Sequence, residues 1–498
     1  MKLVHKIFPK IRPVFVFLAA AALQSAHAQP GAGGPQGIPE EDTLQVLVGT
    51  TGTEQGVQVA PTEPAGAGAF QDWWDGKGLF AGKGNPLFDG RAALEDRGLK
   101  FSGTYQGAFF GVVASEKGAR GFWDEQVALG AELDFGKLSG VEALGGIRAF
   151  GNFRYRDSGA QSNPNDNVQA SSMFNPSNWT SGTQFRILAF GLQVSTEGWL
   201  PVEDMVVLRG GWLQPQREFI DQPLSKLFLN NAVNSSKGVG GNIPFSSSFT
   251  SWGGTLNFKP REEFYVKNGL FMSFPKGSET SNHGLAFGGY SADPSLNGLF
   301  YMGEGGWTPE FGKAELAGKY AFGGYFYGTP QGQTETWNGT EANGRYGFYF
   351  QADQMLFRES DPQAPAGTPG GKGFKQPVSA GKPKLSKQGL HTFNLLTFAP
   401  GNAVQNVYPF YFQTGLTYTG ALPGRGEDQA MVSLAYGSYE RGVGRTPRTY
   451  TAVVEAGYRF QVNGWSYVQP FFQYFSNPNG TGELANAAVL GFMAGVAF

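Results

Sequence analysis

Side chains that can exchange hydrogen bonds with a polar solute recur along residues 147–156. Arg148, Asn152, Arg154 and Arg156 share one face of an extended segment, and the other face is mainly apolar. Each guanidinium offers five donors in a rigid fork. An arginine that faces the bilayer midplane costs about 2–4 kcal/mol, so a membrane-crossing segment must turn this face toward water. The three arginines either narrow a passage or pair with charges in its wall.

Other segments show the same alternation of polar and apolar positions. By this alternation we expect three further pairs to point inward, and these are Glu315 and Lys319, Glu455 and Arg459, and Gln469 and Gln473. Such side chains supply both donors and acceptors to a solute. The alternative is that inward charges and amides bind one another and stabilise the wall.

Residues 215–249 form a long polar connection between two of these segments. The connection carries Arg217 and Glu218, and further on Asp221, Asn230, Asn231, Asn234 and Lys237. Long loops with such residues often carry function. This one either folds inward and constricts a passage or stays at the surface as a lid.

The residues needed for catalysis or metal binding are sparse. A hydrolase of the serine type needs a Ser–His pair. Once an export signal is removed, only His283 and His391 remain, and neither lies beside a Gly-x-Ser-x-Gly motif. Cysteine is absent, and the acidic run Glu40-Glu41-Asp42 lies in a segment expected to be disordered. We therefore predict no catalytic residue, metal or cofactor, and keep a barrel hydrolase as an alternative.

The composition favours a membrane β-barrel. The 498 residues include 75 glycines, 43 phenylalanines, 19 tyrosines and 10 tryptophans, and only 16% are charged. The formal charge of −2 argues against a nucleic-acid partner. Beyond the N-terminus no window offers about 18 consecutive apolar residues, which excludes helical spans. Aromatic residues suit the lipid interfaces, and glycine suits bends and tight turns.

The N-terminus reads as an export signal. A basic stretch precedes the apolar residues Val14–Leu23 and the cleavage site Ala26-His27-Ala28. We assign residues 1–28 to the signal peptide and 29–69 to a disordered leader rich in glycine, proline and alanine. Residues 70–98 form an N-terminal segment with a short helix ending at Gly98. Residues 99–498 form the barrel.

Period-two patterns predict about 16 antiparallel strands, or 18, in an all-β, up-and-down transmembrane barrel. A soluble β-sandwich would carry more charge on its outward face, and a β-helix would show a regular short repeat. The strands are expected near 99–113, 123–135, 147–156, 184–196, 205–214, 250–259, 264–273, 299–308, 313–326, 344–357, 390–398, 408–418, 428–439, 449–462, 465–475 and 485–498.

An even number of strands places both termini on the periplasmic side. Long and short connections then alternate, with one exception. Arg358–Gly389 is long, rich in proline and lysine, and falls on the periplasmic side. It is either an inert insertion or a cationic segment that touches the barrel rim or the anionic cell wall.

Four segments resemble the carbohydrate-selective porin family, the OprB-like outer-membrane glucose porins. Gly347–Met355 resembles the G-x-Y-x-Q-A-D-Q-M strand of that family, and Gly415–Asp428 resembles its G-L-x-Y-x-G-x-x-P-G-R-x-x-D turn. Val468–Tyr474 followed by Asn477-Pro478 resembles its V-Q-P-x-x-Q-Y…N-P hairpin, and Leu94–Phe101 resembles its entry to the first strand. The resemblance spans Leu94 to Phe498.

The resemblance implies a 16-stranded barrel in the outer membrane of a Gram-negative bacterium, through which monosaccharides such as glucose diffuse passively. Two further residues then join the candidate solute-binding residues, namely Arg209 and Asp353. Arg209 begins a run in which most of the acidic residues of the family are replaced here. The expected surroundings are outer-membrane lipid and lipopolysaccharide. Phe498 would be read by the barrel assembly machinery. A porin for anions is the alternative that the arginines favour, and a general-diffusion porin is a further alternative.

Overall fold

The computed structural model describes residues 91–497 except 92, 159–162, 180–183, 198, 201, 203, 221, 236, 244–249, 274–282, 284, 286, 288–297, 329–344, 360–386, 400–405 and 441–446. The predicted signal peptide, leader and most of the segment 70–98 lie outside these residues, as does Phe498. Residues 93–96 are helical, and Gly98 follows with a φ of +90°, a conformation that favours glycine. Within the described residues, no helix is both long enough and apolar enough to cross a membrane.

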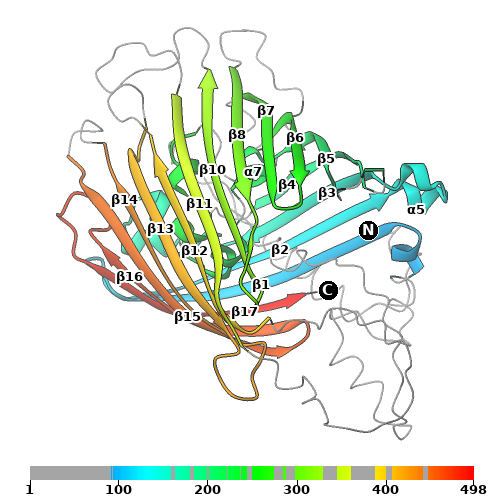
Figure 1. Ribbon diagram of the computed structural model, residues 1–498. Helices are drawn as coiled ribbons and strands as arrows, with labels where there is room; N and C mark the ends of the chain where they lie inside the picture. Colours follow the sequence, from blue (N-terminus) through cyan, green and yellow to red (C-terminus); the bar gives the residue numbers. More distant parts are fainter. Residues whose placement is uncertain are drawn as a thin grey trace, which may run out of the picture.

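The strands form a closed antiparallel barrel. Each strand pairs with its neighbour in the sequence, and β1 pairs with both β2 and β17, so the sheet has no free edge (Figure 1). Sixteen strands make this ring, and the two-residue β9 (Glu310–Phe311) pairs only with the start of β10. The wall strands are β1 (Leu99–Ala114), β2 (Arg120–Asp134), β3 (Ile147–Asp157), β4 (Gln184–Ser195), β5 (Val206–Leu213), β6 (Ser251–Arg261), β7 (Phe264–Ser273), β8 (Gly298–Trp307), β10 (Leu316–Gly328), β11 (Arg345–Arg358), β12 (Gly389–Phe398), β13 (Phe410–Thr419), β14 (Gln429–Ser438), β15 (Tyr450–Asn463), β16 (Ser466–Ser476) and β17 (Ala487–Ala497).

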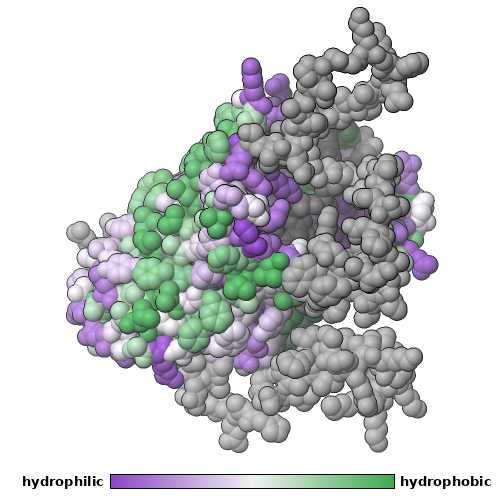
Figure 2. All heavy atoms as spheres, turned by 90° about the horizontal axis from the view of Figure 1, so that it is seen from below, coloured by the Kyte–Doolittle hydropathy of each residue, from purple (hydrophilic) through white to green (hydrophobic). Residues whose placement is uncertain are grey.

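The two faces of the wall differ as the alternation predicts. Phe101 and Trp123 point outward with 44% and 43% of their surface exposed, whereas Gln106 and Gln126 on the same strands are buried inside. Apolar residues gather over the outer wall in Figure 2. Lipid on the outside and polar groups on the inside is the arrangement of an outer-membrane barrel. All sixteen predicted strands are confirmed, with ends that differ by a few residues.

Helical pieces join the strands at both ends and inside the barrel. Asp134 caps α5 by accepting a hydrogen bond from the amide of Lys137, and Gly140 ends it in the left-handed conformation. The pieces are α5 (Phe135–Ser139), η3 (Glu142–Leu144), α6 (Asn165–Val168), η4 (Ser172–Phe174), α7 (Pro215–Phe219), η5 (Pro223–Leu227), α8 (Asn231–Asn234) and α9 (Lys237–Gly240).

Two connections fold into the barrel, and we refer to them as inner segment 163–179 and inner segment 214–243. The amide of Asn178 donates to the carbonyl of Leu229, and the amide of Asn231 to that of Asn175, so the two segments bind each other. Their apolar residues join inward residues of the wall in one core cluster. The sequence left open whether residues 215–249 fold inward, and the described part does. It did not indicate that residues 163–179 do so as well.

Candidate functional site

A polar cavity of about 390 Å³ lies between α7 and the inner wall. Its size falls within the range typical of small-molecule pockets. Strands β3 to β8 and β10, together with their connections at one end, supply the remaining walls. The cavity is lined by Asn152, Leu188, Ala189, Arg209, Gln214, Arg217, Glu218, Phe219, Asn257, Lys259, Glu262, Tyr265, Lys267, Glu304, Thr308 and Lys319.

Local sequence places α7 against this wall. Gln214 is extended, and Pro215 occupies the first turn of the helix, where a missing amide hydrogen costs nothing. The helix turns Glu218 toward two cations. Nη1 of Arg209 lies 3.4 Å from its carboxylate, and Nζ of Lys267 lies 3.9 Å from it. Lys267 also donates to the backbone carbonyl of Glu218, which fixes α7 to β7.

Aromatic rings stand beside these cations. The guanidinium of Arg209 lies 4.4 Å from the centre of the Phe150 ring, and Nζ of Lys267 lies 5.2 Å from the Phe219 ring. Contacts of this kind hold a cation over the face of a ring. The cavity therefore has charged groups in fixed positions next to flat apolar surfaces.

Glu304 forms a second anchor, directly opposite Lys267 on the neighbouring strand β8. Its carboxylate accepts hydrogen bonds from the hydroxyl of Tyr265 at 2.6 Å and of Tyr349 at 2.9 Å, and from the amide of Gln351 at 2.6 Å. Gln351 also donates to the carbonyl of Phe219 at 3.1 Å, which ties α7 to β11. Because several donors share one carboxylate, its position is well defined.

This arrangement suits a solute with many hydroxyl groups or with negative charge. Fixed donors and acceptors can replace the water around hydroxyls, and rings can stack on an apolar sugar face. Five basic side chains line the cavity against three acidic ones. The basic set is Arg209, Arg217, Lys259, Lys267 and Lys319, and the acidic set is Glu218, Glu262 and Glu304.

Five of the fourteen predicted site residues meet at this cavity, namely Asn152, Arg209, Arg217, Glu218 and Lys319. The prediction missed Lys267, Tyr265 and Glu304. A lysine within the mainly apolar β7 was a usable signal, because a lysine that faces lipid is costly. Glu304 gave little signal because glycines flank it and obscure the alternation.

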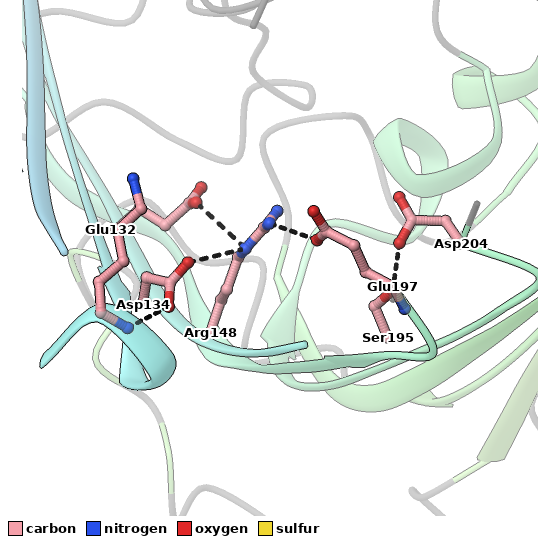
Figure 3. Close-up of polar contacts among 7 residues, drawn as sticks. Glu132, Asp134, Arg148, Ser195, Glu197 and Asp204 are labelled. Carbon is pink, nitrogen blue, oxygen red and sulfur yellow. Dashed lines mark hydrogen bonds and ion pairs between the residues drawn. The ribbon is translucent and has the colours of Figure 1, made fainter. Parts of the chain in front are cut away.

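Arg148 lies apart from the cavity, in a cluster of carboxylates. Its guanidinium donates to Glu197 at 2.6 Å and lies 3.8 Å from both Glu132 and Asp134 (Figure 3). The carboxylates come from the end of β2 and from the connection after β4, near Ser195, which donates to Asp204. These contacts agree with the alternative in which Arg148 pairs with charges in the wall of the barrel.

Arg154 and Arg156 are buried, with 1% and 0% of their surface exposed. Arg154 stands opposite Arg186 of β4, and Nε of Arg156 donates to Gln126 at 3.1 Å. Neither residue lines the cavity. Their expected part in a constriction stays a prediction, and the buried Arg186 beside them was not predicted.

Another group of predicted residues holds inner segment 214–243 to the wall. The carboxylate of Glu455 accepts from the backbone amides of Leu229 at 2.8 Å and Asn230 at 2.7 Å. Gln222 donates to Asp353 at 2.9 Å, and Gln469 donates to the carbonyl of Leu227 at 2.8 Å.

Gln473 and Arg459 complete this group. Gln473 donates to the carbonyl of Pro176 at 2.9 Å and so holds inner segment 163–179. Arg459 donates to Gln469 at 2.8 Å and lies over the Tyr467 ring. The alternation predicted the inward direction of these side chains. Their contacts with the inner segments came only from the tertiary structure.

Glu315 departs from the expected alternation. It precedes β10, which begins at Leu316, and its φ of +46° turns the chain there. The strand expected over 313–326 therefore starts later, and the period-two argument does not apply to Glu315. Its backbone carbonyl accepts a hydrogen bond from Arg358 at 2.8 Å.

Comparison with known proteins gives consistent findings. A family model described as carbohydrate-selective porin, OprB family, matches residues 122–498. Porin B of Pseudomonas aeruginosa PAO1 is 22% identical over 283 residues, which cover 50% of this chain and 56% of that protein. The chain thus aligns with little more than half of that relative.

One solved structure shares the fold, and a second matches more weakly. The structure of Pseudomonas putida OprB at high pH matches with a TM-score of 0.67 and 20% identity, covering 85% of this chain and 99% of that one. The outer-membrane-expressed OmpT of Vibrio cholerae matches with a TM-score of 0.42 at 10% identity over 80% of this chain and 97% of that one.

Proposed function

Because this chain belongs to the carbohydrate-selective porin family, OprB, and so to the Gram-negative outer membrane, we propose that it lets small hydrophilic solutes diffuse passively and prefers monosaccharides such as glucose. The observation that carries the proposal is the cavity beside α7. The cavity brings donors on Arg209, Arg217 and Lys267 together with acceptors on Glu218 and Glu304, and Tyr265 and Phe219 also line it. Such pairs suit a neutral polyol better than an apolar or singly charged solute.

Liposome swelling tests this proposal directly. Purified protein is reconstituted, and swelling is measured in glucose, in an uncharged disaccharide and in an anion matched to glucose in size. We expect glucose to enter faster than either competitor, because the inner segments narrow the barrel around a polar cavity. Equal rates for glucose and the disaccharide would contradict a monosaccharide preference.

An anion porin is the second candidate, and the basic excess around the cavity favours it. Faster entry of the matched anion than of glucose in the same assay would support this candidate. Recognition of Phe498 by the assembly machinery and contact with lipopolysaccharide stay predictions.

Ion selectivity identifies which arginines face the permeating solute. We expect Arg217→Ala to lower the permeability of anions relative to cations, because Arg217 lines the cavity. Arg148→Ala is the comparison variant, since three carboxylates already balance that charge. Reversal potentials in planar bilayers measure both. A larger shift for Arg148→Ala would move the selective region to the carboxylate cluster.

The family and the fold indicate a channel rather than an enzyme. Nδ1 of His283 lies 2.9 Å from the carbonyl of Phe185, and His391 lies on β12 opposite Met355 and Thr417. Neither histidine lines the cavity. Release of fatty acids from phospholipid by the purified protein would instead support the hydrolase alternative.

A further inference from the structure

The outer wall of the barrel carries a shallow apolar hollow of about 550 Å³ over β12 to β17. Two neighbouring rows of outward residues form most of its lining. The first row runs across directly opposed positions, through Leu416, Val432, Ala456, Phe472 and Leu490. The second row comprises Leu390, Tyr418, Ala430, Tyr458 and Pro470.

The sequence explains why the outer surface of the wall is hollowed at this place. Ala430 and Ala456 are small side chains between larger neighbours in both rows. Pro470 has no amide hydrogen, and β15 and β16 have no paired residues between Gly457↔Phe471 and Phe460↔Val468. Proline in a central strand interrupts the ladder in this way. The hollow therefore combines missing side-chain volume with a gap in the pairing.

Polar groups stand at one end of the hollow. The hydroxyl of Tyr458 donates to Asp428 at 3.1 Å, and Arg425 donates to the same carboxylate at 2.8 and 2.9 Å. The side chain of Arg425 is 43% exposed. Tyr418 donates to Glu359 at 2.5 Å. These groups lie at the end of the barrel where β1 begins and β17 ends, which is the periplasmic end of a barrel with an even number of strands.

We infer that this hollow binds one phospholipid of the periplasmic leaflet, with an acyl chain that crosses the two rows from their periplasmic end and the phosphate at Arg425. Inside a bilayer the hydrophobic effect does not favour one apolar partner over another, so close packing decides what occupies the surface. A flexible acyl chain can follow a shallow hollow and restore the missing van der Waals contacts. The convex wall of a second barrel would bridge the hollow and leave a void. The guanidinium is a strong donor to phosphate oxygens.

Native mass spectrometry tests this inference on the whole protein. The protein is reconstituted in vesicles of phosphatidylethanolamine and phosphatidylglycerol, extracted in detergent, and the phospholipids that stay bound are counted. We expect wild type to retain one phospholipid that Ala456→Phe loses, because the ring fills the hollow. Ala131→Phe is the matched control, since Ala131 lies outward on β2 opposite Phe101 and Gly151, away from the hollow.

Heat-modifiable mobility on gels verifies that each variant is folded, and Ala430→Leu replaces Ala456→Phe if the latter fails to assemble. Equal retention of phospholipid by wild type and the filled variant overturns the inference. Equal loss of phospholipid in Ala131→Phe also overturns it. So does a wild-type dimer that Ala456→Phe abolishes and Ala131→Phe does not. Glucose-driven swelling should be the same for all variants, so this test is independent of the proposed pore function.

Discussion

At the scale of single residues, Glu455 is the wall group that holds inner segment 214–243 most directly. It accepts hydrogen bonds from two backbone amides that have no access to water. Leaving a buried donor unpaired costs about 1–3 kcal/mol. The position of the segment inside the barrel thus depends in part on this carboxylate.

We therefore expect Glu455→Ala to loosen inner segment 214–243 and to raise the conductance of the pore. Glu455→Gln keeps one acceptor oxygen and should have a smaller effect. Single-channel recording measures conductance, and swelling in the disaccharide reports the change in size selectivity. Unchanged conductance in Glu455→Ala would mean that the other contacts of the segment suffice to hold it.

Asp428 gives a residue-scale expectation for pH. Burial of this carboxylate acts to raise its pKa, but hydrogen bonds from Arg425, the amide of Gln461 and Tyr458 outweigh burial and lower the pKa below its ordinary value. The unfolded chain, with an aspartate pKa of about 4, then takes up a proton first as the pH falls. The stabilisation is present above that pH and is lost as the pH falls through the folded-state pKa.

Asp428→Asn should consequently lower the midpoint of denaturant unfolding in detergent at neutral pH. The difference from wild type should begin to shrink as the pH falls below about 4, where the unfolded wild-type chain takes up its proton, and should be lost once the pH falls through the folded-state pKa. Unfolding followed by gel mobility at several pH values measures this. A difference in the unfolding midpoint that does not change with pH would show that the charge of Asp428 does not stabilise the turn.

At the scale of elements, the connection between β11 and β12 has a defined side. Arg358 pairs with Gly389, and both lie at the end of the barrel where β1 begins. The sequence predicted this unusual placement from the strand count alone. The ends of the connection lie there because each antiparallel strand reverses direction, so the count determines the end, and the periplasmic side of this end stays a prediction.

A cysteine introduced at Ser379 tests that side in cells, and the natural chain has no cysteine to interfere. We expect a membrane-impermeant maleimide to label Ser379→Cys only after the outer membrane is permeabilised. A cysteine at Glu116, in the connection between β1 and β2 at the opposite end, should be labelled in intact cells. Labelling of Ser379→Cys in intact cells would contradict the assigned orientation.

At the scale of the whole molecule, closure of the barrel depends on close contact between β1 and β17. Gly491 stands opposite Phe110, and a Cβ at this position would collide with the backbone oxygen of Phe109 and with the Phe471 ring. Backbone cannot move aside as a flexible side chain can. Overpacking of this kind costs about 1–3 kcal/mol or more.

We expect Gly491→Ala to reduce the fraction of folded, heat-modifiable barrel in the outer membrane. Gly305→Ala is the matched control, because a Cβ at that strand position of β8 meets nothing within 4 Å. Quantitative blotting of heated and unheated membrane samples measures both variants. Equal assembly of the two would mean that the β1–β17 contact adjusts without cost.

The sequence alone determined the wall of this protein. Alternation at positions such as Arg154 and Phe153 decides which face meets lipid, because a wrong face would place charge in hydrocarbon. The tertiary structure decided what fills the interior. Glu455 and Leu229 meet across more than 200 residues, and Lys267 meets Glu218 only because α7 folds inward. Contacts between distant inner segments and the wall leave no local pattern in the sequence. For this reason the cavity and its lining emerged only with the fold.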